Sequence, residues 1–281
     1  MIEFSNVTKK YGGTAAIDGI SLKIPEQGIY CLLGRNGAGK TTLMKLLAGH
    51  IAATSGKITI DGKNVSTGKM PDCVSYIESG SVQFNMKVSR LIGTAAELQD
   101  GFNHEFALEM IKRFELDPNK KFKALSFGMK TMLTTIIILA NTSKVILLDE
   151  PTLGFDAVMR HHFNTLLLES YTVCPRVIIV STHLIDEIEK VTERLIIIDN
   201  GRILVEAGID DIDEKAYTLS GHANAVAPLI DGLNCIGKTE AGSVMAAHIY
   251  DDRIAPPEGV AIDRLSLQDF FINIVGGNDN V

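Results

Sequence analysis

The 281-residue sequence contains no apolar run that approaches the roughly 20 residues a helix needs to cross a bilayer. Its longest apolar stretches, such as residues 136–140 and 176–180, are short enough to be core elements. The N-terminus lacks a basic region followed by an apolar stretch, so we expect no signal peptide. Repeats and low-complexity tracts are also absent. These absences argue against a membrane-spanning segment in this sequence.

Cysteine is scarce and positive charge does not predominate. The four cysteines, Cys31, Cys73, Cys174 and Cys235, form no CxxC pair, which favours reduced thiols in a cytosolic protein. The net charge of −7 disfavours nucleic acid as a partner, although net charge alone does not exclude a local basic patch. The apolar share of 46% is that of a globular protein. The length fits one large domain, or one domain with a small appendage.

The first third of the chain alternates between strand signals, turn signals and one helical pattern. Glycine and Asp-Gly pairs interrupt the apolar stretches, and leucines recur at helical spacing after a glycine-rich loop. The predicted elements are short antiparallel strands over 2–7 and 17–24, a buried strand over 28–33, a helix over 40–48, and an edge hairpin over 56–62.

The middle of the chain is predicted to be mostly helical between about residues 88 and 139. Strands are expected at 144–148 and 176–180 with a helix between them, and this order indicates a parallel α/β core. A hairpin is predicted over 195–205. The pattern changes after about residue 208, and we interpret residues 209–281 as a small C-terminal accessory region.

Residues 34–42 form a glycine-rich phosphate loop. They match the pattern G-x-x-x-x-G-K-[ST], with a strand before them and a helix after them. Glycines let backbone N–H groups wrap a polyphosphate, and the helix N-terminus adds a positive dipole end. Lys40 can reach the β- and γ-phosphates, and the Thr41 hydroxyl can bind Mg²⁺. An incidental glycine-rich turn is the weaker alternative. The predicted nucleotide-binding residues here are Gly34, Asn36, Gly37, Ala38, Gly39, Lys40, Thr41 and Thr42.

Residues 145–151 read Val-Ile-Leu-Leu-Asp-Glu-Pro, four apolar residues that end in two acids. A buried parallel strand ends in this way at the carboxyl edge of a sheet, where ligands bind. Asp149 is placed to hold Mg²⁺, and Glu150 is suited to orient or deprotonate the attacking water. The alternative is a turn capped by acids before Pro151, which becomes weaker once the phosphate loop is present in the same chain.

With these motifs in order, residues 1–210 resemble the nucleotide-binding subunit of an ABC transporter. Residues 125–129, Leu-Ser-Phe-Gly-Met, resemble the family signature LSGGQ, and 153–156 resemble the loop after the second acid. His183 follows an apolar strand, precedes an acidic segment expected to be helical, and resembles the family's switch histidine. Tyr11 lies where the family stacks an aromatic ring on adenine.

The resemblance implies a fold. It is an α/β P-loop NTPase core with a mixed sheet, an antiparallel β subdomain, an inserted helical subdomain at about 85–140, and a small C-terminal accessory region. The expected boundaries are 1–208 for the ATP-binding domain and 209–281 for the accessory region. The stretch 85–115 corresponds to the part of the family that docks membrane subunits, and the alternative is an ordinary amphipathic helix bundle.

The resemblance also implies a mechanism in which two cassettes close head to tail on two ATP molecules. Ser126, the Gly128 N–H group and Met129 would face the partner's ATP, because they open a helix. His183 would contact the γ-phosphate in its own chain, and Asp156 would help to couple the two sites. Lys40, Glu150 and His183 are the expected catalytic residues, and ATP and Mg²⁺ the expected cofactors.

The sequence departs from the family pattern at two places. Phe127 replaces a signature glycine and Met129 replaces a glutamine, whereas Ser126 and Gly128 remain. The usual metal-side glutamine of the loop before the helical subdomain is replaced by Glu78, with Gln83 as the alternative if the loop is shifted. We therefore predict Thr41, Asp149 and Glu78 as the residues on the metal side.

The leading functional hypothesis is an ATPase subunit that drives export through separate transmembrane permease subunits, at the cytoplasmic face of the membrane. A second ATP-binding subunit is expected as a partner, and nucleic acid is not. Lys130, Glu78 and the ending at 266–271 resemble the drug- and peptide-exporter branch, which points to a peptide, toxin or drug-like cargo. The alternatives are a soluble ABC-type ATPase of translation or DNA repair, and a non-hydrolysing nucleotide sensor.

Overall fold

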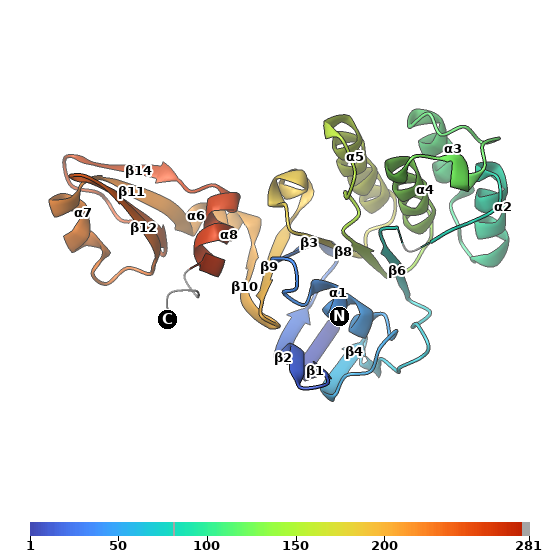
Figure 1. The fold of residues 1–281 in the computed structure, drawn as a ribbon, viewed down its shortest axis with the longest axis horizontal. Helices are drawn as coiled ribbons and strands as arrows, with labels where there is room; N and C mark the ends of the chain where they lie inside the picture. Colours follow the sequence, from blue (N-terminus) through green and yellow to red (C-terminus); the bar gives the residue numbers. More distant parts are fainter. Residues whose placement is uncertain (81, 277–281) are drawn as a thin grey trace.

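The computed structural model describes residues 1–80 and 82–276, in which a mixed six-stranded sheet forms the centre (Figure 1). The strand order is β10-β9-β3-β8-β7-β6, and only β10 and β9 pair in the antiparallel sense. Strands β3, β7 and β8 are buried along their whole length, which explains their continuous apolar sequences. The strands are β3 (Gly28–Leu33), β6 (Val74–Glu78), β7 (Val145–Asp149), β8 (Val177–Thr182), β9 (Arg194–Asp199) and β10 (Arg202–Gly208).

The strand order brings three loops to one edge of this sheet. Leu33, the last residue of β3, pairs with Thr182 of β8, and Asp149 of β7 pairs with Ser181 of β8. The phosphate loop, the two acids and His183 therefore follow neighbouring parallel strands at their carboxyl ends. This edge is where open α/β sheets bind ligands.

A second, antiparallel sheet covers one face of the central sheet, with helix α1 (Lys40–Leu47) between them (Figure 1). Its order is β2-β1-β4-β5. Strands β1 and β2 extend beyond the short strands expected, because register shifts along β1 let the pairing continue to the Gly12-Gly13 turn. The strands are β1 (Ile2–Tyr11), β2 (Thr14–Ile24), β4 (Ser55–Ile60) and β5 (Lys63–Asn64).

Helices cover the opposite face of the central sheet (Figure 1). Alternate residues of β3 serve the two layers: Ile29 and Cys31 face the helices, whereas Tyr30 and Leu32 face α1 and the antiparallel sheet. The helical segments are α2 (Val88–Leu98), α3 (His104–Arg113), η1 (Phe122–Ala124), α4 (Phe127–Leu139) and α5 (Ala157–Val173). No helix in the described part of the chain is long and apolar enough to span a membrane.

The segment after His183 differs from the acidic helix that the sequence suggested. It forms two 3₁₀ turns, η2 (Ile185–Glu187) and η3 (Glu189–Val191). Ile185, Ile188 and Val191 recur every three residues and are all buried. A spacing of three matches the 3₁₀ repeat, so this geometry places all three side chains in the core.

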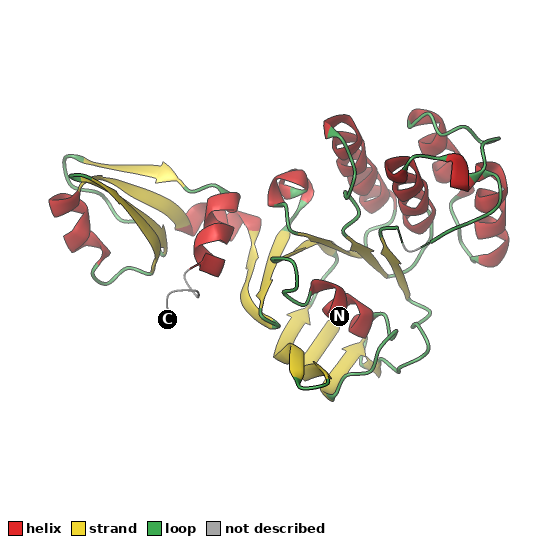
Figure 2. Cartoon of the chain, in the orientation of Figure 1, coloured by secondary structure: helices red, strands yellow, loops and turns green. Residues whose placement is uncertain are grey.

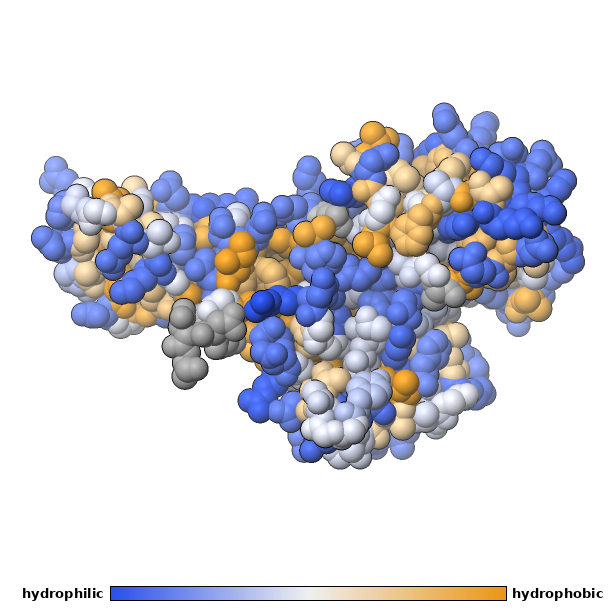
Figure 3. All heavy atoms as spheres, in the orientation of Figure 1, coloured by the Kyte–Doolittle hydropathy of each residue, from blue (hydrophilic) through white to orange (hydrophobic). Residues whose placement is uncertain are grey.

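Residues 209–276 form a module with its own four-stranded antiparallel sheet, in the order β12-β13-β11-β14 (Figure 2). Tyr217, Leu219 and Val226 belong to its separate small core. On the face seen in Figure 3, apolar atoms gather where α8 lies beside β10. The elements are α6 (Ile209–Lys215), β11 (Ala216–His222), α7 (Ala223–Ile230), β12 (Cys235–Ala241), β13 (Val244–Tyr250), β14 (Val260–Arg264) and α8 (Leu267–Gly276).

Helix α8 returns from this module to the central core. Leu267 and Phe270 belong to the same buried cluster as Ile185 and Ile188, which follow His183. The predicted fold class is confirmed in its mixed sheet, antiparallel β subdomain, inserted helices and C-terminal region. The strands of that last region were not predicted from the sequence.

Candidate functional site

The phosphate loop connects β3 to α1 and is shaped by glycines. A side chain at Gly39 would strain the backbone, since φ is +111°, and its first carbon would lie 2.6 Å from the Ala16 carbonyl oxygen. Gly34 has no space either, because the Ile198 carbonyl lies against it. Lys40 is 7% exposed, and its Nζ donates to the Gly34 carbonyl at 2.8 Å and the Arg35 carbonyl at 3.3 Å.

Glu150 connects Lys40 of the phosphate loop to His183. Its Oε1 lies 3.3 Å from Nζ of Lys40, and its Oε2 lies 3.0 Å from Nδ1 of His183. Because a carboxylate oxygen accepts hydrogen bonds, we assign an N–H group to Nδ1 of His183, directed at Oε2 of Glu150. The structure thus brings together the three predicted catalytic residues, Lys40, Glu150 and His183, which are far apart in the sequence.

The backbone of Glu150 is held in an unusual conformation. Its φ is +49°, a region that costs a non-glycine residue about 1 kcal/mol or more. The Glu150 N–H donates to Oγ of Ser181 at 3.1 Å, and the Glu150 carbonyl accepts from Oγ of Ser79 at 2.6 Å and from the Leu153 N–H at 3.2 Å. These bonds hold the turn that directs the carboxylate toward Lys40.

Asp149 lies at the end of β7 and is 2% exposed. The Ser181 hydroxyl donates to Oδ1, and the Tyr76 hydroxyl donates to Oδ2 at 3.3 Å. Burial raises the pKa of Tyr76, as do the charges of Asp149 and Glu78, so this hydroxyl remains a donor at neutral pH. Sequence reasoning gave no role to Ser181 or Tyr76, although Ser181 is the register partner of Asp149 on β8 and Tyr76 lies two residues before Glu78, the partner of Asp149 on β6.

Glu78 ends β6 directly beside Asp149 in the sheet register. Its Oε2 accepts from the Tyr76 hydroxyl at 3.4 Å and pairs with Nζ of Lys45 at 2.9 Å. The two carboxylates predicted on the metal side, Glu78 and Asp149, are therefore neighbours on adjacent strands. Gln83 is exposed, in the loop before α2.

The signature residues open helix α4. The Oγ of Ser126 caps this helix by accepting the Met129 N–H at 3.2 Å. Gly128 is buried against Met159 and the Gly154 carbonyl, so the signature lies against the loop that follows Glu150.

Two more predicted residues lie at element ends. Tyr11 is 52% exposed at the end of β1, with Nζ of Lys9 5.0 Å from its ring centre. Asp156 caps α5 by accepting the Met159 N–H at 2.8 Å. Asn36 and Gly37 are exposed in the phosphate loop, whereas Ala38 is buried and Thr41 and Thr42 are half-buried at the start of α1.

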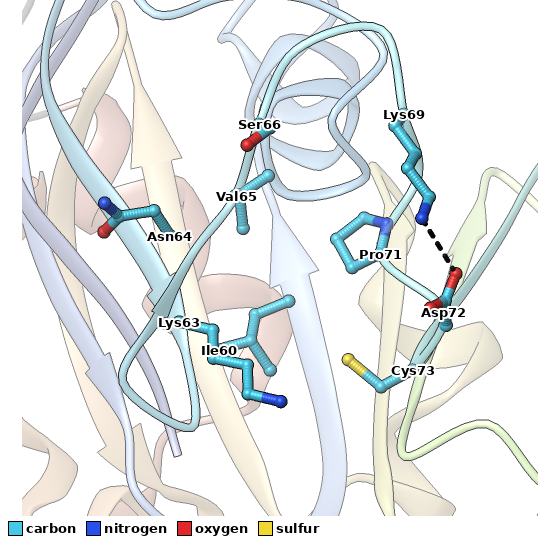
Figure 4. A pocket seen from close by; sticks show the side chains of 9 residues that line it. All are labelled: Ile60, Lys63, Asn64, Val65, Ser66, Lys69, Pro71, Asp72 and Cys73. Atoms are coloured by element: carbon cyan, nitrogen blue, oxygen red, sulfur yellow. Dashed lines mark ion pairs between the residues drawn. The ribbon is translucent and has the colours of Figure 1, made fainter.

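A hollow of about 360 Å³ lies between the β4–β5 hairpin and the loop before β6 (Figure 4). Its lining includes an ion pair between Lys69 and Asp72 at 3.7 Å. None of the lining residues is a predicted site residue. They are Ile60, Lys63, Asn64, Val65, Ser66, Lys69, Pro71, Asp72 and Cys73.

Comparison with known proteins decides the family. The profile of the ABC transporter family matches residues 17–153, from β2 through the two acids. The ABC transporter ATP-binding protein YtrB of Bacillus subtilis is 30% identical, over 76% of this chain and 74% of that protein. This chain belongs to the ABC transporter ATP-binding proteins.

Two further relatives in this family are named for export or transport. A Nod factor export ATP-binding protein of Burkholderia orbicola is 34% identical, over 73% of this chain and 70% of that protein. The bacitracin transport ATP-binding protein BcrA of Enterococcus faecalis is 29% identical, over 99% of this chain and 97% of that protein. The second match spans the C-terminal module as well as the ATP-binding region.

Solved structures confirm the fold. The ATP-binding subunit of an ABC transporter superposes with a TM-score of 0.67 at 22% identity, over 75% of this chain and 91% of the other. The predicted class, an ATP-binding motor subunit of an ABC transporter with ATPase activity, is confirmed by the family match. The family match does not support the alternative of an ATPase in translation or DNA repair.

Proposed function

We propose that this chain hydrolyses MgATP between two cassettes and thereby powers export of a peptide, toxin or drug-like molecule through separate permease subunits. The observation that carries the proposal is the position of Glu150. Its carboxylate lies between Nζ of Lys40 and Nδ1 of His183, at the carboxyl end of a buried strand. A carboxylate there can accept a proton from water that attacks the γ-phosphate.

The residues around Glu150 have complementary roles in the proposal. Lys40 exchanges its contacts with Glu150 and the loop carbonyls for the β- and γ-phosphate oxygens when ATP binds. The loop N–H groups and the start of α1 stabilise the same negative charge. His183 orients the Glu150 carboxylate through its Nδ1–H group. Its Nε2 can accept a hydrogen bond from the attacking water, or donate one to a γ-phosphate oxygen when the ring carries both protons.

The donor set fits Mg²⁺. Asp149 is a buried carboxylate whose oxygens are bonded by two neutral hydroxyls, from Ser181 and Tyr76. Mg²⁺ typically takes one or two carboxylates together with phosphate oxygens and water. Thr41, Asp149 and Glu78 would hold the ion on the protein side. When bound, the ion supplies charge neutralisation at the phosphates.

A second cassette completes each site in this proposal. Ser126 is exposed at the start of α4, a 13-residue helix whose N-terminal dipole favours an anion. The signature of one chain would contact the γ-phosphate held by its partner's phosphate loop, with Met129 beside it. Tyr11 would stack on adenine, and Asp156 would connect the two sites.

The proposed assembly places the chain at the cytoplasmic face of the membrane, bound to permease subunits. Residues 1–208 form the ATP-binding domain, which includes a helical subdomain at about 85–140 with its docking stretch at about 85–115, and 209–281 form the accessory region. Support for export comes from relatives whose names specify Nod factor export and bacitracin transport. Recovery of permease subunits with the tagged chain from detergent-solubilised membranes tests this assembly; a chain found only in the soluble fraction would contradict it.

The chemical part is tested with Glu150→Gln in the purified full-length chain. Loss of a general base typically costs about 10²–10⁴-fold in rate, so we expect kcat to fall by at least about 100-fold. We also expect ATP to trap a dimer that size-exclusion chromatography resolves. Glu97→Gln is the matched control, because Glu97 is 60% exposed on α2. Unchanged hydrolysis in Glu150→Gln would remove Glu150 from the assigned role.

A further inference from the structure

The ring of Phe127 contacts two loops, at Gly80 and Gly154, that follow β6 and β7 at the carboxyl edge of the central sheet. A methyl group built on Gly154 would lie 2.7 Å from Cδ1 of Phe127, and one on Gly80 would lie 3.2 Å from Cε2. Both glycines have positive φ, +80° and +74°. The phenyl ring therefore packs directly on the backbone of both loops, at places where a side chain would be strained and would also meet the ring.

Both loops also hold the backbone of Glu150. Ser79, next to Gly80, donates its hydroxyl to the Glu150 carbonyl at 2.6 Å and its N–H to the Asp149 carbonyl at 3.1 Å. The Leu153 N–H, next to Gly154, donates to the same Glu150 carbonyl at 3.2 Å. One ring thus contacts both segments that fix a residue whose own φ is +49°.

The ring also belongs to the first turn of the signature helix. Ser126 caps this turn, and Gly128 packs against the Gly154 carbonyl and Met159. Phe127 is 44% exposed, so its contacts bury only part of the ring. The contacts therefore contribute little to global stability, whereas they connect three segments near the reacting groups.

We propose that Phe127 is a positioning residue that connects the start of the signature helix to the backbone of Glu150. This inference rests on the proposed role of Glu150 as the base. A shift of α4 on contact with the partner's nucleotide displaces the ring, and the ring displaces the Gly80 and Gly154 loops. In this way, one ATP site influences the carboxylate of the other.

Phe127→Ala in the purified full-length chain tests the proposal. A misplacement of about 1 Å can cost on the order of 100-fold in rate, so we expect kcat to fall at least about tenfold. Binding of a fluorescent ATP analogue to the Lys40 loop should stay within about twofold, because Phe127 does not belong to that loop. Phe127→Leu should recover most of the rate, since it retains apolar contact with both glycines.

Two further readouts separate positioning from simple packing. Amide hydrogen exchange at residues 152–155 should accelerate in Phe127→Ala, as the loop loses its contact. Ser79→Ala and Phe127→Ala should be non-additive in kcat, because both act on the same carbonyl of Glu150. The control is Leu168→Ala on α5, whose residue is 45% exposed and which should leave kcat unchanged.

The proposal is overturned if Phe127→Ala keeps kcat within twofold, or if its effect and that of Ser79→Ala simply add. Thermal unfolding of each variant shows whether the fold is retained. If the alanine variant does not fold, Phe127→Gln, which keeps side-chain length but loses the apolar ring, takes its place with the same expected fall in kcat. Absence of hydrolysis in the unsubstituted chain would contradict the proposed function. The exchange measurement still tests the contact in that case, and unchanged exchange would overturn it.

Discussion

Nζ of Lys45 lies 2.9 Å from Oε2 of Glu78, where the family pattern has glutamine as the metal-side residue. Lys45 is one helical turn beyond Thr41 on α1, so the pair lies beside the predicted metal site. The Glu78 carboxylate, which adds negative charge near the predicted triphosphate site, is therefore paired with the ammonium group of Lys45. Both side chains are partly exposed, at 30% and 39%, so solvent screens the ion pair and its interaction energy is modest.

Lys45→Met should raise the apparent KM for MgATP, because it leaves the negative charge of Glu78 without its neighbouring ammonium group. A loss of about 1 kcal/mol at such a pair would raise the apparent KM about fivefold. The double variant Lys45→Met with Glu78→Gln should return KM close to its original value. Lys69→Met, at a residue 78% exposed in the Lys69–Asp72 pair, is the control. An equal KM increase with and without Glu78→Gln would show that the pair is not the cause.

Tyr76→Phe should lower the affinity for Mg²⁺. The substitution removes the hydroxyl that bonds both Asp149 and Glu78 but keeps the ring. A lost hydrogen bond to a charged group costs about 1.5–3 kcal/mol, an upper bound here because 3.3 Å is a long bond. Titration of ATPase activity with Mg²⁺ at saturating ATP measures the effect.

Tyr171→Phe is the control for this prediction. The Tyr171 hydroxyl lies in the field of Glu26 and Glu193, which precede β3 and β9 at the opposite edge of the sheet. A shift of the Mg²⁺ midpoint in Tyr171→Phe as large as that in Tyr76→Phe would contradict the assignment.

His183→Ala should reduce kcat strongly while ATP still binds. The imidazole contacts the Glu150 carboxylate at 3.0 Å, so its loss leaves the carboxylate with Lys40 as its remaining contact from the triad of residues 40, 150 and 183. We expect kcat to fall by about 10²-fold or more, which is the usual effect of losing general acid–base catalysis. Single-turnover hydrolysis separates this loss from effects on product release.

His248→Ala provides the matched control, because His248 bonds Thr218 within the C-terminal sheet. Its kcat should stay within about twofold of the unsubstituted chain. A full rate in His183→Ala would show that Glu150 is oriented without the imidazole.

Phe270→Ala in helix α8 should destabilise the chain. Phe270 is fully buried and packs edge-on against Tyr250, with ring centres 4.9 Å apart. Truncation of a buried phenylalanine costs about 3–5 kcal/mol in free energy of unfolding. Denaturant unfolding should show this loss. Ile272→Ala, at a residue 54% exposed on the same helix, should change stability by less than about 0.5 kcal/mol.

The sequence was most informative where chemistry depends on neighbouring residues. The phosphate loop and the Asp149-Glu150 pair lie in continuous motifs, and a strand before each one placed both at the same sheet edge. Their convergence follows from parallel pairing of β3, β8 and β7. Long-range contacts were not readable in this way: Lys45 and Glu78 are 33 positions apart, and nothing in either local sequence indicates the pair.

The C-terminal sheet illustrates a second limit. Strand β12 carries exposed polar residues on both faces toward its end, so its pattern lacks the alternation typical of a half-buried strand. Strand β14 pairs with β11, about 40 residues earlier, and this partnership has no local signal. The Phe127 contact was likewise invisible, since Gly80 and Gly154 approach it from separate loops.

Helix α8 has a consequence for biosynthesis. Leu267 and Phe270 complete the same buried cluster as Ile185 and Ile188, behind the segment that carries His183. A chain emerging from the ribosome forms the phosphate loop early, but it cannot complete this cluster until residues near 276 have left the exit tunnel. Nascent chains are therefore left with an exposed apolar surface beside the segment that carries His183 until α8 has emerged, and chaperones can bind that surface in the meantime.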